Sequence, residues 1–286
     1  MNTTAAQWLE RADILREALP YMRRYSGRSI VIKFGGHAME SQAGVDGFAQ
    51  DVSLLKQIGM NPIIVHGGGP MIKAMLTRLN IETKAVNGLR VTDDATMEVA
   101  EMVLGRVNKD LVAAFNRAGE SAVGLSGKDG ALLRAEKLMP DGQDIGWVGK
   151  PAFVNPRILA AMESASIIPV IAPIGFGAGG ETYNINADTV AGAVASAIGA
   201  TRLYMLTDVQ GILDADKTLI PELSPEQAEA LKASDVINGG MIPKVDTCLD
   251  AVAQGVEGAV ILDGRVRGSI LLDLLTDLGQ GTLFRA

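Results

Sequence analysis

The stretch Arg28-Ser29-Ile30-Val31-Ile32-Lys33-Phe34-Gly35-Gly36-His37 joins a short apolar run to a lysine and two glycines. The run over residues 29–34 predicts a buried β-strand. A lysine and paired glycines at a strand end are typical of a phosphate site, because glycine lets the backbone approach a ligand closely. The common phosphate-loop pattern G-x-x-x-x-G-K-[ST] is absent, so the sequence indicates a phosphate site of another kind.

A second glycine-rich stretch, His66-Gly67-Gly68-Gly69-Pro70, follows the next apolar run. Ligands of open α/β sheets bind at the carboxyl ends of strands, and the helix that follows offers free N–H groups to an anion. The simpler alternative is a tight turn with no ligand. Three glycines here, together with Gly35 and Gly36 after the earlier strand, favour a site.

Apolar runs and helical patterns alternate along the chain. Continuous apolar strands are typical of a mostly parallel sheet covered by helices on both faces, so we expect an α/β sandwich. The expected strands are 29–34, 62–66, 121–126, 167–172, 202–207 and 258–262. The expected helices are 45–58, 69–79, 93–117, 156–164, 187–198, 225–233, 244–254 and 269–276.

Two segments lie outside this alternation. Residues 4–25 predict an amphipathic helix before the first strand, in which Pro20 should produce a kink or an interruption. The pattern does not decide whether this helix packs on its own domain or on another subunit. Residues 131–154 are glycine-rich with little helical periodicity and predict a β-hairpin excursion.

Composition excludes several classes of protein. The formal net charge is −7 and aromatic residues are only 4% of the 286 residues, which argues against a general nucleic-acid binder. No apolar run reaches the length of about 18 residues that a membrane span needs. The single cysteine, Cys248, is expected to be a small buried residue. With no apolar signal core at the N-terminus, we expect a cytoplasmic protein.

Charged and polar residues stand out in three further stretches. In Asn87-Gly88-Leu89-Arg90-Val91-Thr92, Arg90 is suited to a carboxylate ligand, although a solvated surface arginine is the commoner case. The stretch Asn184-Ile185-Asn186-Ala187-Asp188 has three polar residues at alternate positions. Capping of the helix that follows accounts for one of them but not for all three. In Gly239-Gly240-Met241-Ile242-Pro243-Lys244, a second lysine stands close to a glycine pair. Lys33 is likewise close to the pair Gly35-Gly36.

Together these stretches resemble the amino acid kinase family, in the family's order from about residue 28 to the C-terminus. The matching segments are 32–36, 65–69, 87–92, 184–188, 208–213 and 239–244. Each motif alone is modest, but the set is specific. The Asn-Gly-Leu-Arg-Val-Thr stretch resembles the branch of the family that phosphorylates N-acetyl-L-glutamate.

The resemblance implies a three-layer αβα sandwich with an open, mostly parallel sheet. It implies an oligomerisation helix over residues 1–27 and one kinase domain over 28–286, with an acceptor lobe (28–175) and an ATP lobe (176–286). The implied reaction moves the γ-phosphoryl group of ATP to the side-chain carboxylate of N-acetyl-L-glutamate, in arginine biosynthesis. Mg²⁺ would be carried mainly by the ATP phosphates.

The same resemblance implies roles for individual residues. Lys33 and Lys244 would neutralise charge on the migrating phosphoryl group, and Asp188 would orient both lysines. The backbone N–H groups of Gly36 and Gly69 would donate to the phosphoryl oxygens. A carboxylate acceptor is already ionised at neutral pH, so neither His37 nor His66 is needed as a general base. The acceptor would be held by Gly68, Gly69, Arg90 and Asn184. The nucleotide would contact Lys33, Asp208, Val209, Gln210, Gly211, Ile212, Leu213, Val236, Ile237, Asn238 and Lys244.

Family members with an N-terminal helix of this kind are arginine-inhibited hexamers, built as trimers of dimers. The resemblance therefore implies a homohexamer and an L-arginine site, for which the candidates are Tyr21, Asp273 and Gly279. The chain departs from the family pattern at Asp273, where a glutamate is usual, and at Val260, near which a histidine is common. Some relatives also bind a PII-type signalling protein.

Two alternatives remain at the level of the sequence. One is a sister kinase that acts on an aminoadipate derivative, since one sequence does not exclude a longer acceptor. The other is a catalytically silent arginine sensor, which the intact Lys33, Lys244 and Asp188 disfavour.

Overall fold

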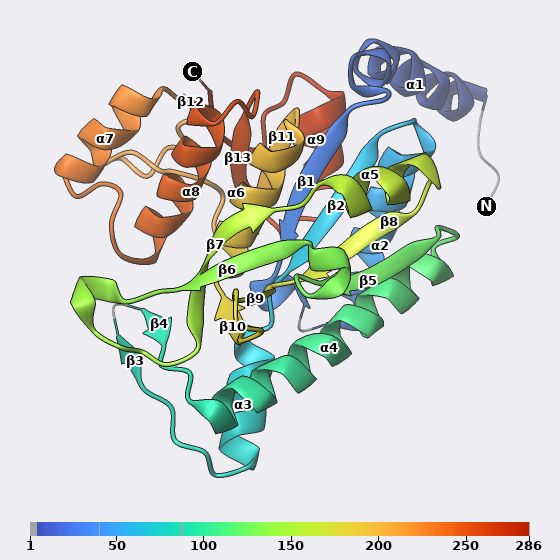
Figure 1. Ribbon diagram of the computed structural model, residues 1–286. Helices are drawn as coiled ribbons and strands as arrows, with labels where there is room; N and C mark the ends of the chain where they lie inside the picture. The colour runs from blue at the N-terminus through green and yellow to red at the C-terminus, as the bar shows by residue number, and fades with distance from the viewer. Residues whose placement is uncertain (1–4, 40, 87, 286) are drawn as a thin grey trace.

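A computed structural model describes residues 5–39, 41–86 and 88–285 of the chain, so Asn87 of the arginine-containing stretch lies outside the described residues. The described chain forms a sandwich with a central sheet between two layers of helices, as expected from the sequence (Figure 1). A smaller group of strands, β6, β7, β9 and β10, lies against one side of this sandwich (Figure 1).

The central sheet has eight strands in the order β12-β14-β13-β11-β1-β2-β8-β5. Neighbouring strands are parallel throughout, except that β13 and β14 are antiparallel. The strands are β1 (Ser29–Phe34), β2 (Asn61–His66), β5 (Ala122–Ser126), β8 (Ile168–Ala172), β11 (Arg202–Thr207), β12 (Glu222–Leu223), β13 (Ala259–Asp263) and β14 (Gly281–Phe284). Pairing of β1 with β11 joins the two halves of the chain in one sheet.

Alternate residues of β1 point to opposite faces of the sheet. Ile30 and Ile32 join the core beneath one helix layer, whereas Val31 joins the core on the other side. The first layer consists of α2 (Gln42–Gln57), α3 (Gly69–Arg78), α4 (Asp94–Arg117) and α9 (Ser269–Leu275). The second consists of α5 (Arg157–Ser164), α6 (Ala187–Ile198), α7 (Pro225–Ala233) and α8 (Ile242–Ala253).

The predicted hairpin excursion is confirmed. Strands β6 (Leu133–Lys137) and β7 (Val148–Val154) are antiparallel, and they close a small four-stranded sheet with β9 (Ile174–Phe176) and β10 (Thr182–Ile185). A separate two-stranded hairpin is made by β3 (Ala85–Val86) and β4 (Leu89–Arg90). The sequence does not predict β3, β4, β9, β12 or β14, because each is too short to show a period.

Most predicted helices end within one or two residues of the observed bounds, but two begin earlier than expected. Helix α2 begins at Gln42 rather than at residue 45, because the Ser41 side chain caps it by accepting a hydrogen bond from the Gly44 N–H at 3.1 Å. Helix α8 begins at Ile242 rather than at Lys244, with Pro243 in its first turn, where proline costs no hydrogen bond.

The N-terminal helix α1 (Ala5–Tyr25) is continuous through Pro20, so of the two expected outcomes the interruption is wrong, and the kink stays a prediction. Its last turns pack on the same chain: Tyr25 is buried, and Tyr21 and Met22 lie against the core. Its earlier turns expose large apolar side chains, among them Leu9 (65% exposed) and Leu15 (64%). The C-terminal end of the helix therefore packs on its own domain.

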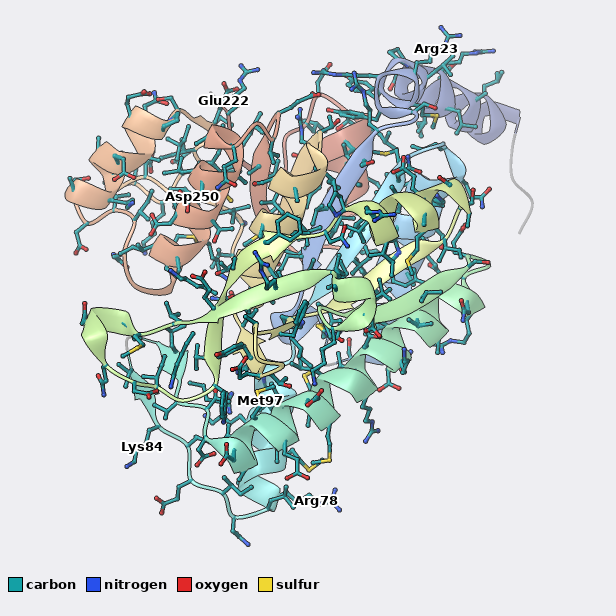
Figure 2. The ribbon with its side chains drawn as sticks, in the orientation of Figure 1. Arg23, Arg78, Lys84, Met97, Glu222 and Asp250 are labelled. Carbon is teal, nitrogen blue, oxygen red and sulfur yellow. The ribbon has the colours of Figure 1, made fainter. Side chains whose placement is uncertain are left out.

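Charged side chains cover the rim of the molecule. Arg23 on α1, Arg78 on α3 and Lys84 before β3 lie at separate edges (Figure 2) and are all exposed. None of the helices in the described ranges is both long and apolar enough to cross a bilayer. Cys248 is buried, as expected.

Candidate functional site

The glycine loops after β1 and β2 meet at the carboxyl end of the sheet. Phe34 is paired with His66 across the two strands, and the Gly67 N–H donates to the Phe34 carbonyl at 2.8 Å. A Cβ on Gly35 would lie 3.0 Å from the Lys33 Nζ and 3.5 Å from the Gly67 Cα. A larger residue at position 35 would therefore push against both the lysine and the second loop.

Lys33 and Lys244 are brought together on one carboxylate. The Nζ atom of Lys33 lies 3.1 Å from Oδ1 of Asp188, and the Nζ atom of Lys244 lies 2.6 Å from Oδ2. Lys33 is on the same face of β1 as Val31, which is the face that α6 and α8 cover. Asp188 is in the first turn of α6 and Lys244 in the first turn of α8.

The charge of this cluster is positive overall. Burial alone raises the pKa of Asp188, but the nearby charges of Lys33 and Lys244 outweigh it and hold that pKa below the ordinary value. Asp188 is thus ionised at neutral pH, and two ammonium groups share one carboxylate. Lys33 is only 9% exposed, so water screens this excess charge poorly and the cluster is suited to an anion.

A cavity of about 260 Å³ lies beside the lysine cluster. Its wall combines residues predicted for the phosphoryl group with residues predicted for the acceptor, namely Lys33, Gly36, Gly68, Gly69, Arg90, Asn184 and Asp188. The wall also includes apolar residues that were not predicted, among them Ile72, Leu104, Val148 and Pro173. Leu104 belongs to the apolar face of α4, which the sequence does show, but its role as a cavity wall depends on packing.

Arg90 lies in this cavity rather than on the open surface. It ends the β3–β4 hairpin, and its Nη2 donates to the Gly69 carbonyl at 3.1 Å. Burial lowers the pKa of Arg90 below its ordinary value, and the guanidinium is still charged at neutral pH. The Thr92 hydroxyl donates to the Arg90 carbonyl at 3.0 Å and accepts from the Asn184 amide at 3.4 Å.

The three polar residues around Asn186 have separate functions in the fold. Asn186 caps α6, since its side chain accepts from the Asp188 N–H at 2.8 Å. Asn184 faces the cavity and Asp188 holds the lysines. Capping therefore explains one of the three, as the sequence indicates.

Trp147 was not predicted and is hydrogen-bonded to three residues near the site. Its indole N–H donates to the Asp94 carboxylate at the start of α4, at 2.5 Å. Its backbone N–H donates to the Thr92 carbonyl, and its carbonyl accepts from the Asn184 N–H. The β6–β7 excursion is thereby attached to both segments that the sequence analysis predicts for the acceptor.

The two predicted nucleotide segments are anchored in one core. Ile212 and Ile237 are both buried in the cluster beneath α6 and α8, whereas Asp208, Val209 and Gln210 are exposed. The Ile212 N–H donates to the Thr282 hydroxyl at 2.8 Å, which fixes the first segment to β14. Contact of either segment with a nucleotide stays a prediction.

The candidate arginine-site residues lie where α1 meets the C-terminal segment. The Tyr21 hydroxyl donates to Asp277 at 2.5 Å, and this hydrogen bond raises the pKa of Tyr21. Burial raises the pKa of Asp273, which accepts from the Tyr204 hydroxyl at 2.7 Å. Tyr204 and Asp277 are two residues that the sequence analysis missed. Gly279 follows Asp277 by two residues, and its N–H donates to the Asp277 carbonyl at 3.2 Å.

A family model described as the amino acid kinase family matches residues 28–263 of the chain. An acetylglutamate kinase from Acidiphilium cryptum (strain JF-5) is 56% identical over 288 residues, covering 97% of this chain and 96% of its own. An acetylglutamate kinase from Rhodospirillum rubrum is also 56% identical, covering 98% of this chain and 94% of its own.

Solved structures show the same fold. N-acetylglutamate synthase from Neisseria gonorrhoeae, complexed with coenzyme A and N-acetyl-glutamate, superposes with a TM-score of 0.86 at 27% identity. The match covers 96% of this chain and 63% of the synthase chain. Carbamate kinase from Giardia lamblia, bound to AMP-PNP, has a TM-score of 0.67 at 14% identity and covers 91% of this chain and 99% of its own, which shows the fold alone.

Proposed function

The chain belongs to the amino acid kinase family, and we propose that it transfers the γ-phosphoryl group of ATP to the side-chain carboxylate of N-acetyl-L-glutamate. The product is an acyl phosphate in the biosynthesis of arginine. The observation that carries the proposal is the ion-paired set Lys33–Asp188–Lys244 beside a cavity that contains Arg90. Relatives named acetylglutamate kinase at 52–56% identity over nearly the whole chain support the same acceptor.

In the proposed step, an oxygen of the acceptor carboxylate attacks the γ-phosphorus, and the bond from that phosphorus to the β–γ bridging oxygen breaks. ADP leaves with the bonding electrons. The acceptor is already an anion at neutral pH, so no proton has to be removed from it. Phosphoryl transfer then depends mainly on positioning and on neutralising charge, which is the role of Lys33 and Lys244.

Asp188 contributes to this step by holding both lysines. Without it, two ammonium groups close together would repel and lose their common anchor. The N–H groups of Gly36 and Gly69 are assigned to phosphoryl oxygens. Gly69 begins α3, and the first N–H groups of a helix have no partner within that helix, so they are free to bind an anion.

The acceptor end of the cavity is assigned to Arg90, Gly68, Gly69 and Asn184. Arg90 would bind the α-carboxylate, since a guanidinium can donate two parallel hydrogen bonds to a carboxylate. Its bond to the Gly69 carbonyl keeps it beside the glycine loop. The Asn184 side chain would bind the amide part of the acceptor.

The ATP lobe would hold the nucleotide through residues 208–213 and 236–238. Both oxygens of Asp188 already face lysines, and no group of three or more His, Cys, Asp or Glu side chains suited to a metal occurs in the described ranges. The donors present therefore fit Mg²⁺ that is carried by the ATP phosphates. Bound there, Mg²⁺ neutralises charge on the β- and γ-phosphate oxygens.

We further propose that the chain is a cytoplasmic homohexamer that L-arginine inhibits. The exposed apolar side chains Leu9, Ile14 and Leu15 of α1 support assembly through this helix. The cluster of Tyr21, Asp273 and Asp277 offers carboxylates for a cationic effector. N-acetylglutamate synthase from Neisseria gonorrhoeae was solved with L-arginine, and it has a TM-score of 0.84 at 26% identity, covering 96% of this chain and 65% of its own.

Trapping of the product tests the function. The purified chain is incubated with Mg-ATP and hydroxylamine, which converts an acyl phosphate to a hydroxamate. N-acetylglutamate is compared with glutamate, aspartate, aminoadipate and N-acetylaminoadipate, each with and without arginine. We expect hydroxamate from N-acetylglutamate alone and suppression by arginine. Hydroxamate mainly from another acid would overturn the acceptor, and none from any acid would overturn the kinase assignment.

A further inference from the structure

A buried polar pair lies directly behind the glycine loop, and the proposed reaction does not use it. His66 ends β2 and is 0% exposed, and Asn108, in the middle of α4, is 4% exposed. Both lie among apolar residues of the core beneath α4. Buried polar groups cost free energy unless they are hydrogen-bonded, so this pair requires an explanation.

The neighbours of the two side chains determine the tautomer of His66. The Nδ1 atom lies 2.9 Å from the Gly67 carbonyl, which only accepts, so Nδ1 carries the hydrogen. The Nε2 atom lies 3.1 Å from the Asn108 Nδ2. That nitrogen also lies 2.8 Å from the Val170 carbonyl, which identifies it as the amide donor. Nε2 is therefore the acceptor, and Asn108 locks the ring in the Nδ1–H form.

The ring stays neutral at physiological pH. Burial lowers the pKa of His66 from 6.5 to about 4, and the hydrogen bond to Gly67 only partly offsets this. Protonation would moreover put a hydrogen on Nε2, facing the hydrogen of the Asn108 amide. One donor and one acceptor are thus maintained on the ring.

This tautomer restrains the peptide between Gly67 and Gly68. The Gly67 N–H is held by the Phe34 carbonyl at 2.8 Å, and the Gly67 carbonyl is held by His66 Nδ1–H. The described peptide bonds are all trans, so the Gly68 N–H points opposite to the Gly67 carbonyl. That carbonyl is directed at His66 in the core, whereas Gly67, Gly68 and Gly69 line the cavity. The Gly68 N–H is therefore directed away from the core.

We propose that His66 is a positioning residue: through its Nδ1–H bond to the Gly67 carbonyl, and with Asn108 fixing the tautomer, it keeps the Gly68 N–H aimed at the acceptor carboxylate. The proposal rests on the proposed function. A glycine loop has many accessible conformations, and flipping one peptide would replace the N–H with a carbonyl that repels both anions in the site. His66 and Asn108 exclude that flip.

Helix α4 also packs closely against the glycine loop and against strand β5. A Cβ on Gly68 would lie 2.7 Å from Leu104 Cδ2, so α4 also supports the loop from one turn earlier. A Cβ on Gly124, in the edge strand β5, would lie 1.7 Å from Asn108 Oδ1. The glycine at position 124 thus leaves the room that the Asn108 amide occupies.

The tautomer can be measured without any activity. The chain has two histidines, so ¹⁵N-histidine labelling gives two rings, and the His37→Gln variant assigns them. We expect the His66 nitrogen shifts to show a protonated Nδ1 and an unprotonated Nε2 at neutral pH. In Asn108→Leu, which removes the amide donor, we expect a mixture of both tautomers. An Nε2–H tautomer in the unmodified chain would overturn the proposal.

The effect on catalysis is tested with three variants and a matched control. His66→Leu removes the donor to Gly67 and should lower kcat/KM for the acceptor by about 10²-fold, the usual cost of misplacing a reacting group. His66→Asn places an amide N–H where Nδ1 was and should recover most of that loss. Asn108→Leu should fall between them. The KM for ATP should stay nearly constant in all three.

Asn116→Leu serves as the control. Asn116 is on the same helix α4 and accepts a hydrogen bond from the Ala122 N–H at the start of β5 at 3.2 Å, but it is remote from His66. A loss of activity caused only by loosening α4 against β5 would occur in Asn116→Leu as well. Equal losses in Asn108→Leu and Asn116→Leu, or in His66→Leu and His66→Asn, would overturn the positioning role.

The two proposals fail in different measurements. Failure of the proposed function is seen in the unmodified chain, as an absence of product or as product from another acid. Failure of the His66 proposal is seen only when variants are compared, with whichever acid the unmodified chain phosphorylates. Thermal unfolding of each variant, with and without Mg-ATP, identifies a variant that has not folded. If His66→Leu has not folded, His66→Asn is compared with the unmodified chain instead.

Discussion

Asp188 accounts for the arrangement of the two lysines that we assign to catalysis. Each lysine is held by a different oxygen of this one carboxylate, at 3.1 Å for Lys33 and 2.6 Å for Lys244. Lys33 and Asp188 are buried and Lys244 is half-buried, so removing one partner leaves the others with uncompensated charge in a region of low dielectric. The cluster is therefore more sensitive to substitution than an exposed ion pair would be.

We predict that Lys33→Ala and Lys244→Ala each lower kcat by about 10²- to 10³-fold, as for the loss of one preorganised group that stabilises developing charge. Steady-state kinetics with N-acetylglutamate and Mg-ATP measure the effect. Lys232→Ala is the matched control, because Lys232 is also ion-paired, with Asp246 at 2.6 Å, but lies outside the cavity. Reductions of less than about tenfold would remove either lysine from the catalytic step.

We predict a pH dependence of stability that depends on His66. Its folded pKa is about 4 and its unfolded value is 6.5, so below 6.5 the unfolded state binds a proton that the folded state does not. Above pH 6.5 this contribution is fully present, and it is lost as the pH falls towards 4, by about 3 kcal/mol in total. Urea unfolding across this range should show a shallower pH dependence for His66→Asn. Parallel curves for the two proteins would contradict the prediction.

Among the elements, α1 has two ends in different surroundings. Its last turns contribute Tyr25 to the core and place Tyr21 beside Asp277. Its earlier turns expose the apolar side chains of Leu9, Ile14 and Leu15. An isolated helix segment of this length is marginally stable in water, so we expect a partner surface to stabilise these turns.

We predict that deletion of residues 1–17 reduces the assembly from a hexamer to a dimer and leaves the kinase reaction without arginine close to that of the full chain. The deletion stops before Ala18, because Ala18, Tyr21 and Met22 pack on the core. Light scattering after size exclusion measures the mass, and the trapping assay measures the activity. A truncated chain that still forms a hexamer would show that another surface builds it.

At the scale of the whole molecule, β11 connects the candidate effector site with the predicted nucleotide segment. Tyr204, within this strand, donates to Asp273 at the candidate effector site. The same strand ends at Thr207, where the predicted nucleotide segment begins with Asp208. A shift of the effector region would therefore reach the nucleotide segment along one rigid element.

We predict that Tyr21→Phe weakens arginine inhibition roughly tenfold, since the variant loses a hydrogen bond to a charged group, and leaves activity without arginine unchanged. The arginine concentration that halves the rate measures this effect. Arg16→Gln, on the same helix, loses only an exposed ion pair with Asp13 and is the matched control. An unchanged arginine response in Tyr21→Phe would place the effector elsewhere.

The main elements of this fold can be predicted from local pattern. The apolar runs 29–34 and 202–207 coincide with β1 and β11, because a strand covered on both faces must be apolar along its whole length. The short strands β3, β9 and β12 could not be predicted, since two or three residues carry no period. The predicted start of α2 was too late, because its capping residue Ser41 lies outside the apolar pattern.

The sequence determined which residue types stand near strand ends and helix starts: the lysines, the glycine loops, Arg90 and Asp188. These residues occur in short motifs of neighbouring residues, so they can be recognised from the sequence. Only the tertiary structure decided which of them meet. Lys244 reaches Asp188 across 56 residues, Asn108 reaches His66 across 42, and Tyr21 reaches Asp277 across 256. Such contacts follow from the order and register of the strands, because packing of the sheet against its helices, not local propensity, sets the distance between remote side chains.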